Sequence, residues 1–244
     1  MSQYNIIAQT NESTVVTEYT MREVTAITYQ SEADLEQEFI DLLCEEGYVY
    51  LPIHSESELI TNLRKQLELL NDYTFSDNEW NRFFKDVLAN QAEGIKEKTE
   101  KLQEGGSIQL LERDDGSHKN IMLIDKTHIH NNRLQVINQY AIGTAEGATH
   151  DNRYDVTVLV NGLPMVHIEL KRRGVAIREA FNQINRYQRD SFWAGSGLFE
   201  FVQIFVISNG TNTKYYSNST RFNHISRISA IKKRLIICVL QQAR

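Results

Sequence analysis

The sequence predicts an α/β fold, in which a sheet is flanked by helices and a helical insertion separates the strands. Three observations predict it. Strand-like runs rich in β-branched residues flank Asn161-Gly162, an amphipathic helix pattern follows over 172–190, and the nearly continuous apolar run LFEFVQIFVISNG comes next. This order of strands, helix and buried strand is typical of an α/β domain.

The composition is that of a globular protein with a sizeable core. The chain has 244 residues, of which 41% are hydrophobic and 24% charged. Two distant cysteines, Cys44 and Cys238, give no disulfide framework and suit a reducing compartment. There is no apolar run of membrane-spanning length, and the N-terminus lacks the pattern of a signal peptide. We therefore expect a cytoplasmic protein without a membrane partner.

The charge is distributed unevenly along the chain. The net charge is −6, and the segment 31–46 is strongly acidic. From residue 214 onwards there is no acidic residue, but there are seven basic ones: Lys214, Arg221, Arg227, Lys232, Lys233, Arg234 and Arg244. Such asymmetry permits a polyanionic partner, although a solvated surface explains it equally well.

The first elements are short. Alternating polar and β-branched residues over 4–30 predict one or two strands. Ser31 with Asp34 three residues later predicts the start of a helix, with Asp in place of the usual Glu of a capping box. Gly47 predicts its end, and YVYLPI predicts a short strand that Pro52 terminates.

A helical insertion is predicted over about 55–104. Its residues are charged and follow a helical period, and either Ser76 or Asp77 caps its second half. Gly105-Gly106 ends the insertion. Two short strands, SIQLL and NIMLI, follow it and are joined by the turn sequence RDDGS.

The remaining elements complete the sheet. NNRLQVINQYAI predicts a strand and GTAEGATHDN a loop, after which the Asn161-Gly162 pair predicts a β-hairpin. Within 172–190, the amphipathic helix begins after the break at Gly174. LFEFVQIFVISNG predicts a central buried strand, with TKYYSN as its neighbour.

The hairpin carries three ionisable residues at its open end. Asp155 lies on the first strand, and Glu169 and Lys171, two residues apart, point to one face of the second. Two close carboxylates repel each other unless a cation lies between them, and Mg²⁺ prefers oxygen ligands. A neighbouring lysine can orient or deprotonate a water molecule beside the metal ion. This set suits the hydrolysis of a phosphodiester, although a charge ladder on an edge strand is the simpler interpretation.

The register of the hairpin tests this interpretation. A two-residue turn would pair Asp155 with Ile168 and so place it on the face opposite Glu169. A loop with an odd number of residues, or a bulge, would restore Asp155 to a position opposite Glu169. Pro164 disfavours the tight turn because it lacks an N–H donor. We therefore predict that the turn is not a two-residue one.

The helix after the hairpin contributes a second set of polar residues. Gln183 and Tyr187 are four apart and share a helix face. A neighbouring stripe that could contact phosphates consists of Arg178, Asn182, Arg186 and Arg189. Simpler roles exist for both residues of the pair, because Tyr187 suits a core position and Gln183 an exposed one.

Together these blocks resemble a known family. Asp155, the IELK of 168–171 and Gln183-x-x-x-Tyr187 look like the motifs of PD-(D/E)XK nucleases with a Gln-x-x-x-Tyr motif. More narrowly, about residues 30–220 resemble the N-terminal endonuclease domain of the R (restriction, motor) subunit of type I restriction enzymes. The resemblance implies a restriction-endonuclease-like mixed sheet flanked by helices.

The resemblance also implies roles for single residues. Asp155 and Glu169 would hold Mg²⁺, and Lys171 would position the attacking water. Gln183 and Tyr187 would support the site or contact DNA. A glutamate of the first helix would approach the metal site, and both Glu36 and Glu38 are candidates. The substrate would be double-stranded DNA, and the partners would be methyltransferase (M) and specificity (S) subunits.

The resemblance has limits along the chain. The nuclease domain would cover 1–220, including the insertion at about 55–104, while 221–244 stops resembling the family. The motor domains, which use ATP in the complete R subunit, are absent, and no G-x-x-x-x-G-K-[ST] motif occurs. We therefore expect no ATP site in these residues, and the basic charge of the tail is poor evidence for DNA binding.

Three alternatives stay open. The chain could be a non-catalytic nuclease-fold module that docks to the methyltransferase and specificity subunits. A structural zinc site could use four histidines, although no pair of cysteines accompanies them: His128, His130, His150 and His167. Glycoside hydrolysis by the carboxylate pair is disfavoured by the adjacent lysine and by the lack of an aromatic sugar platform.

Overall fold

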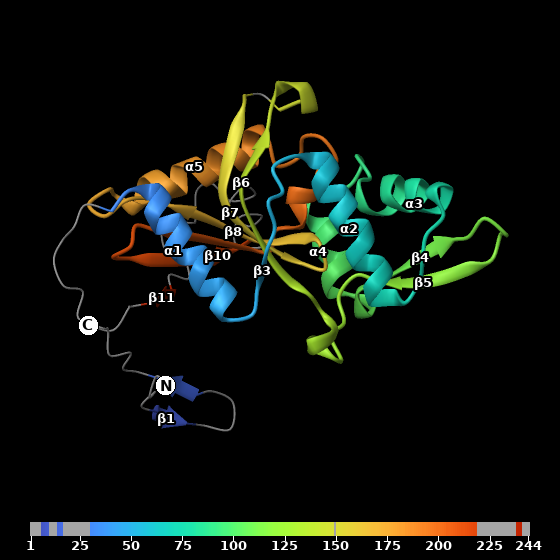
Figure 1. The fold of residues 1–244 in the computed structure, drawn as a ribbon, viewed down its shortest axis with the longest axis horizontal. Helices are drawn as coiled ribbons and strands as arrows, with labels where there is room; N and C mark the ends of the chain where they lie inside the picture. The colour runs from blue at the N-terminus through green and yellow to red at the C-terminus, as the bar shows by residue number, and fades with distance from the viewer. Residues whose placement is uncertain (1–5, 10–13, 17–29, 149, 219–237, 241–244) are drawn as a thin grey trace, which may run out of the picture.

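The computed structural model describes residues 6–9, 14–16, 30–148, 150–218 and 238–240. Its main sheet has seven strands, of which β8 is the middle one. In order across the sheet they are β11 (Cys238–Leu240), β10 (Thr213–Ser217), β9 (Ile204–Ser208), β8 (Leu163–Leu170), β7 (Asn152–Val160), β6 (Leu134–Ile142) and β3 (Val49–Tyr50) (Figure 1). The pairs β8/β9 and β3/β6 are parallel and the others antiparallel. The predicted fold class, a restriction-endonuclease-like mixed sheet flanked by helices, is confirmed.

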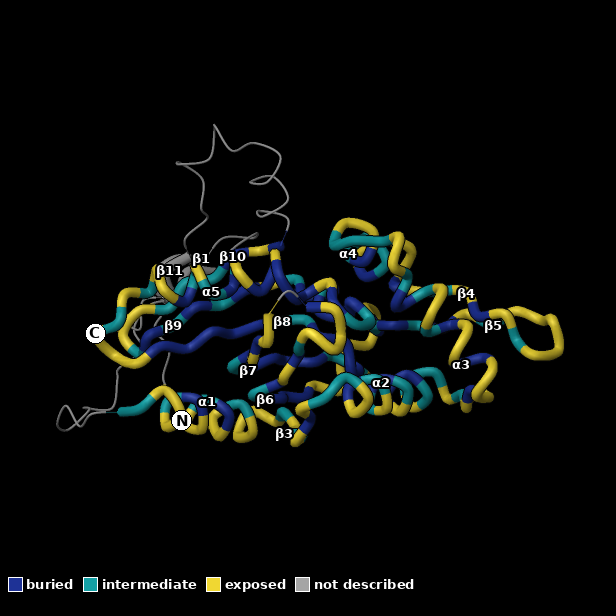
Figure 2. The backbone as a smooth tube through the Cα atoms, turned by 90° about the horizontal axis from the view of Figure 1, so that it is seen from above, coloured by how far each residue is buried: buried dark blue, intermediate teal, exposed yellow. Residues whose placement is uncertain are grey.

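Two helices cover opposite faces of this sheet, α1 (Glu32–Glu45) and α5 (Ile177–Asp190) (Figure 2). The predicted start of α1 is confirmed, because the Ser31 hydroxyl accepts from the Asp34 N–H and the Asp34 carboxylate accepts from the Ser31 N–H, both at 3.1 Å. The helix buries Ile40 against a small apolar cluster on the sheet: Val136, Val156, Val158, Ile168 and Leu170. This burial holds the first turn of α1 close to the open end of the hairpin.

The predicted helical insertion is also confirmed. It contains α2 (Glu56–Asn71), α3 (Asp77–Phe83) with a π-helical turn (Phe84–Leu88), and α4 (Ile95–Gln103). Ser76 is the N-cap of α3, since its hydroxyl accepts from the Glu79 N–H. Beyond it, β4 (Ile108–Glu112) and β5 (His118–Met122) pair as a separate antiparallel sheet. No described helix is both long and apolar enough to cross a membrane.

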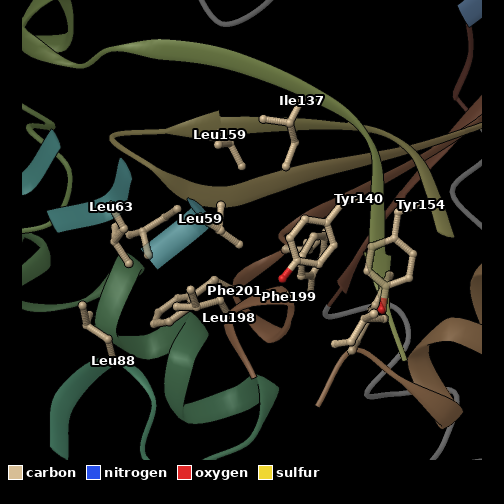
Figure 3. Close-up of a cluster of buried hydrophobic side chains, with 14 of the residues drawn as sticks. Leu59, Leu63, Leu88, Ile137, Tyr140, Tyr154, Leu159, Leu198, Phe199 and Phe201 are labelled. Atoms are coloured by element: carbon tan, nitrogen blue, oxygen red, sulfur yellow. The ribbon is translucent and has the colours of Figure 1, made fainter. Parts of the chain in front are cut away.

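The insertion shares one hydrophobic core with the main sheet. Leu59 and Leu63 of α2 point toward Leu159 of the hairpin in Figure 3. The same core contains a group of stacked and edge-on rings: Tyr140, Tyr154, Phe192, Phe199 and Phe205. The insertion therefore packs as part of the domain that holds the hairpin.

Two predicted strands need comment. The run LFEF was predicted as strand but forms a 3₁₀ helix (Leu198–Phe201), and β9 begins only at Ile204. The prediction was wrong there because burial in the aromatic core explains the apolar side chains without extended backbone.

The early strands are confirmed as β1 (Ile6–Gln9) and β2 (Thr14–Val16), which pair with each other. Residues 17–29 and all of the 221–244 tail except β11 lie outside the described residues.

The hairpin of β7 and β8 has the tight turn that we predicted against. Val160 pairs with Leu163, so Asn161 and Gly162 form a two-residue turn, with φ of +51° and +83°. The register then shifts, because Leu159 pairs with Pro164 but Val158 pairs with Val166. Met165 is the extra residue of a β-bulge, the alternative that restores the acid pair. Extending the Val156–Ile168 pairing by one residue sets Asp155 opposite Glu169.

The turn is held against the insertion, which gives a test of the packing. A Cβ at Gly162 would lie 2.6 Å from Leu63 Cα, and its φ is positive. We expect Gly162→Ala to lower the free energy of unfolding by about 3 kcal/mol, from the left-handed conformation and the clash together. Gly116→Ala in the β4–β5 turn is the control, because its φ is +78° but nothing lies within 4 Å. Equal losses in denaturant unfolding of the two variants would contradict the close packing.

Candidate functional site

Three of the predicted site residues meet at the open end of the hairpin. Lys171 Nζ lies 2.9 Å from Glu169 Oε1 and 3.9 Å from Asp155 Oδ2. We call Asp155, Glu169 and Lys171 the acid–lysine cluster. The bulge sets Asp155 opposite Glu169, and the two-residue spacing puts Lys171 on the same side as Glu169. The register therefore places both acids on one face, as the metal-binding interpretation of the sequence requires.

Burial makes the carboxylates of the cluster costly to ionise. Glu169 is fully buried and only 19% of the Asp155 side chain is exposed. Burial, together with the negative charge of Glu169, raises the pKa of Asp155 to about 7. Burial also raises the pKa of Glu169, although Lys171 opposes the shift. Asp155 keeps a fixed orientation because its Oδ2 accepts a hydrogen bond of 2.9 Å from the Leu170 N–H.

Lys171 is the cation of this site. Burial lowers the pKa of its amine, but the neighbouring carboxylates, Glu169 first, outweigh burial and raise it overall. Its Nζ donates to Glu169 Oε1 and, at 3.0 Å, to the Leu170 carbonyl. An ammonium has three N–H donors, so a third remains for a water or a phosphate oxygen.

The N-terminal half of α1 places two acids near the cluster. Of the two predicted candidates, Glu36 and not Glu38 interacts with the site: it lies near enough to Asp155 for their charges to interact, is buried, and accepts hydrogen bonds from Asn138 and Gln139. Burial raises the pKa of Glu36, and Asp155 adds to the shift. Sequence reasoning missed Glu32, whose Oε2 lies 3.8 Å from Lys171 Nζ. No sequence pattern identifies Glu32, because it is distant from Lys171 in the chain and meets it only in the folded structure.

The Gln-x-x-x-Tyr pair packs behind the cluster. Tyr187 is 1% exposed, and its hydroxyl donates a hydrogen bond of 2.8 Å to the Arg153 carbonyl on β7. Gln183 donates to the same hydroxyl. Tyr187 thus ties α5 to the strand that carries Asp155, which is a supporting position. A DNA contact by the partly exposed Gln183 stays a prediction.

The donor set fits a hard divalent ion. Asp155 and Glu169 supply two carboxylates beside Lys171, and burial, followed by the negative charge of Glu169, raises the pKa of Asp155 to about 7. Mg²⁺ is commonly bound by one or two carboxylates, with waters and phosphate oxygens completing its shell. Within the described part of the chain, no group of three or more His, Cys, Asp or Glu residues could hold a metal ion. The carboxylate pair would therefore be the protein's contribution.

The histidines of the zinc alternative lie in different environments. The His128 side chain is 74% exposed and lies 3.8 Å from Asp125 Oδ2, while His167 is fully buried in the main core. Burial lowers the pKa of His167 to about 4, so the ring is neutral near pH 7.

Comparison of the sequence with known proteins places this chain in a family. Residues 29–224 match the family described as type I restriction enzyme R protein N terminus. The type I restriction enzyme EcoprrI endonuclease subunit of Escherichia coli is 44% identical over 216 residues, which cover 88% of this chain and 67% of the relative.

Staphylococcal relatives are much longer than the chain. The SsaAORF53P endonuclease subunit of Staphylococcus saprophyticus is 39% identical over 198 residues, and the SauMSSORF170P subunit of Staphylococcus aureus is 36% identical over 199. These alignments cover 79% of this chain but only 20% of each relative. The matched residues include every strand of the main sheet except β11, both flanking helices and the whole acid–lysine cluster. The chain belongs to the family of type I restriction enzyme R protein N-terminal regions.

Proposed function

We propose that this chain is the Mg²⁺-dependent endonuclease part of a type I restriction enzyme R subunit. It would hydrolyse phosphodiester bonds of double-stranded DNA in the restriction of foreign DNA. The observation that supports this most is the convergence of Asp155, Glu169 and Lys171 at one end of a buried hairpin. The endonuclease names of the relatives agree with it.

Each residue of the cluster has a chemical task in this proposal. Asp155 and Glu169 would hold the ion, which would offset the negative charge that builds up on the phosphate. The raised pKa of Lys171 makes it a hydrogen-bond donor rather than a base near pH 7. Its third N–H would therefore orient the attacking water or stabilise a phosphate oxygen.

The exposed stripe on α5 would bind the DNA backbone. Arg178, Asn182, Arg186 and Arg189 are all exposed. Guanidinium groups bind phosphate oxygens without reading the base sequence. These contacts would hold the duplex while Tyr187 and its bond to Arg153 keep the hairpin in place.

The activity of the whole enzyme is a further part of the proposal. We infer that the complete R subunit acts with methyltransferase and specificity subunits, and that ATP-dependent translocation belongs to its motor domains. The 244 residues contain no phosphate-binding Gly-rich motif for ATP. The task proposed for this chain is the cleavage step alone.

Removing one metal ligand tests the proposal. We expect the chain to nick or linearise plasmid DNA with Mg²⁺ or Mn²⁺, and Glu169→Gln to lower the rate by about 10³-fold or more, because the charge that holds the ion is lost. Glu179→Gln, an exposed acid on α5, is the matched control and should cleave at the wild-type rate.

Two outcomes would contradict catalysis by this chain. The first is the absence of metal-dependent cleavage by the wild type. The second is cleavage that persists in Glu169→Gln. Either would favour the non-catalytic module, which docks to the methyltransferase and specificity subunits and leaves its acids unused.

A further inference from the structure

His167 is a buried polar residue to which the proposed reaction assigns no task. It lies on β8 two residues before Glu169, so the two side chains share a face of the strand. Its side chain is fully buried. Burying an imidazole whose nitrogens lack hydrogen-bond partners costs folding free energy, so the groups around His167 indicate what its nitrogens can bind.

Aromatic rings hold the imidazole on several sides. The rings of Tyr154, Tyr187 and Phe192 lie edge-on to it, with centroids 5.4, 5.9 and 5.5 Å away. Tyr154 is itself held, because its hydroxyl is hydrogen-bonded to Ser191 at 2.7 Å. The imidazole plane is therefore set by packing rather than by solvent.

The two ring nitrogens face different groups. Nδ1 is 3.4 Å from the Thr157 hydroxyl, across the β7–β8 pair. Nε2 is 3.6 Å from Glu169 Oε2, and neither of these two atoms has a hydrogen-bond partner. A neutral imidazole has one donor and one acceptor nitrogen. If the Thr157 hydroxyl donates to Nδ1, then Nε2 carries the hydrogen and faces a carboxylate oxygen that can accept it.

A small movement would satisfy both buried atoms. A separation of 3.6 Å is just beyond hydrogen-bond distance, and leaving a buried donor or acceptor unpaired costs about 1–3 kcal/mol. The other oxygen of Glu169, Oε1, already accepts from Lys171. The two carboxylate oxygens thus face different directions, Oε2 toward the core and Oε1 toward the cluster.

We propose that His167 is a positioning residue for the metal-binding carboxylate. Thr157 selects the tautomer, the imidazole N–H donates to Glu169 Oε2, and Oε1 is kept turned toward Lys171, where it would help to hold the ion. This inference rests on the proposed Mg²⁺-dependent function. Groups that hydrogen-bond to metal ligands orient them, and their loss commonly weakens metal binding about 10–100-fold.

The test measures Mn²⁺ affinity of the 244-residue chain by isothermal titration calorimetry. We expect His167→Leu to weaken Mn²⁺ binding about 10–100-fold, since the donor is lost. His167→Gln should stay within about 3-fold of wild type, because its amide N–H₂ reaches the position of Nε2. His167→Asn, which reaches only the position of Nδ1, should behave like the leucine variant. A merely structural role would not separate glutamine from asparagine.

Thr157→Val supplies an independent arm, because it leaves the ring in place. It removes the hydroxyl that selects the tautomer, and we expect Mn²⁺ binding to weaken about 3–10-fold, a smaller loss than removal of the donor itself. Circular dichroism before each titration identifies any variant that has not folded. Should the histidine variants fail to fold, the Thr157→Val result decides the inference.

The outcomes separate this inference from the proposed function. Wild-type affinity in His167→Leu, or in Thr157→Val if the histidine variants do not fold, would overturn the role of His167 alone. So would equal losses in the glutamine and leucine variants. A wild-type chain that binds no Mn²⁺ would overturn the metal-dependent function and this inference with it.

Discussion

Asp155→Asn is expected to abolish cleavage and at the same time to stabilise the metal-free chain. Loss of the carboxylate removes a proposed metal ligand, so the cleavage rate should fall by about 10³-fold or more. The buried carboxylate itself is costly to fold, because its pKa is raised to about 7 by burial and by Glu169. Asparagine keeps an oxygen that can accept from the Leu170 N–H but carries no charge.

The stabilisation should depend on pH in a defined direction. An aspartate with an unfolded pKa near 3.9 and a folded pKa near 7 binds more protons in the folded state between these values, so its contribution to stability falls as pH rises. The difference between variant and wild type should therefore grow from about pH 4 to pH 7 and reach roughly 2–4 kcal/mol at pH 8. His167 titrates with the opposite sign, but it is present in both proteins and largely cancels.

Thermal unfolding at pH 5 and pH 8 without metal measures this effect. In a domain of this size 1 kcal/mol corresponds to roughly 2–4 °C, so a Tm increase of roughly 5–10 °C is expected at pH 8. Asp86→Asn, at an exposed position, is the matched control and should not change Tm. An Asp155→Asn variant that is less stable than wild type at pH 8 would contradict the electrostatic account of the site.

Lys171→Met is expected to abolish cleavage but to destabilise the chain. Its ammonium is the partner of fully buried Glu169, and removing one member of a buried ion pair costs about 3–5 kcal/mol. Tm should fall by about 10 °C at pH 8. The loss should be smaller at pH 5, where Glu169 can take up a proton because burial raises its pKa.

The control for this variant is Lys65→Met, at an exposed position on α2. It should cleave DNA and unfold like the wild type. The two cluster variants thus lose activity while their stabilities change in opposite directions, which no general unfolding effect can produce. Unchanged stability in Lys171→Met would show that Glu169 does not depend on this lysine.

Much of the fold could be predicted from sequence because the strong signals are local. Ser31 and Asp34 cap α1 as expected, and Ser76 caps α3. The prediction failed at LFEF, where apolar character alone cannot separate a strand from a buried 3₁₀ turn. Local sequence patterns predict where helices begin, but they say less about the backbone conformation within an apolar run.

The site required information that no local pattern carries. The order of Asp155, Glu169 and Lys171 indicated the chemistry, but the turn was predicted wrongly because Pro164 weighed against a tight hairpin. Proline is tolerated there, since the bulge begins directly after the Leu159–Pro164 pair. Glu32 comes from a helix more than a hundred residues earlier and is brought to Lys171 only by the packing of α1 on the sheet.

Because of the bulge at Met165, the hairpin should respond differently to a deletion and to an insertion in β8. The strand β8 carries one residue more than its pairing with β7 needs. Deleting Met165 would leave every other pair of the hairpin intact and keep the two acids facing each other. A residue inserted between the bulge and Glu169 could not be compensated in this way. It would shift the alternation of side chains by one and turn Glu169 to the other face of the sheet. Along this strand, shortening by one residue is tolerable for the acid pair, and lengthening by one is not.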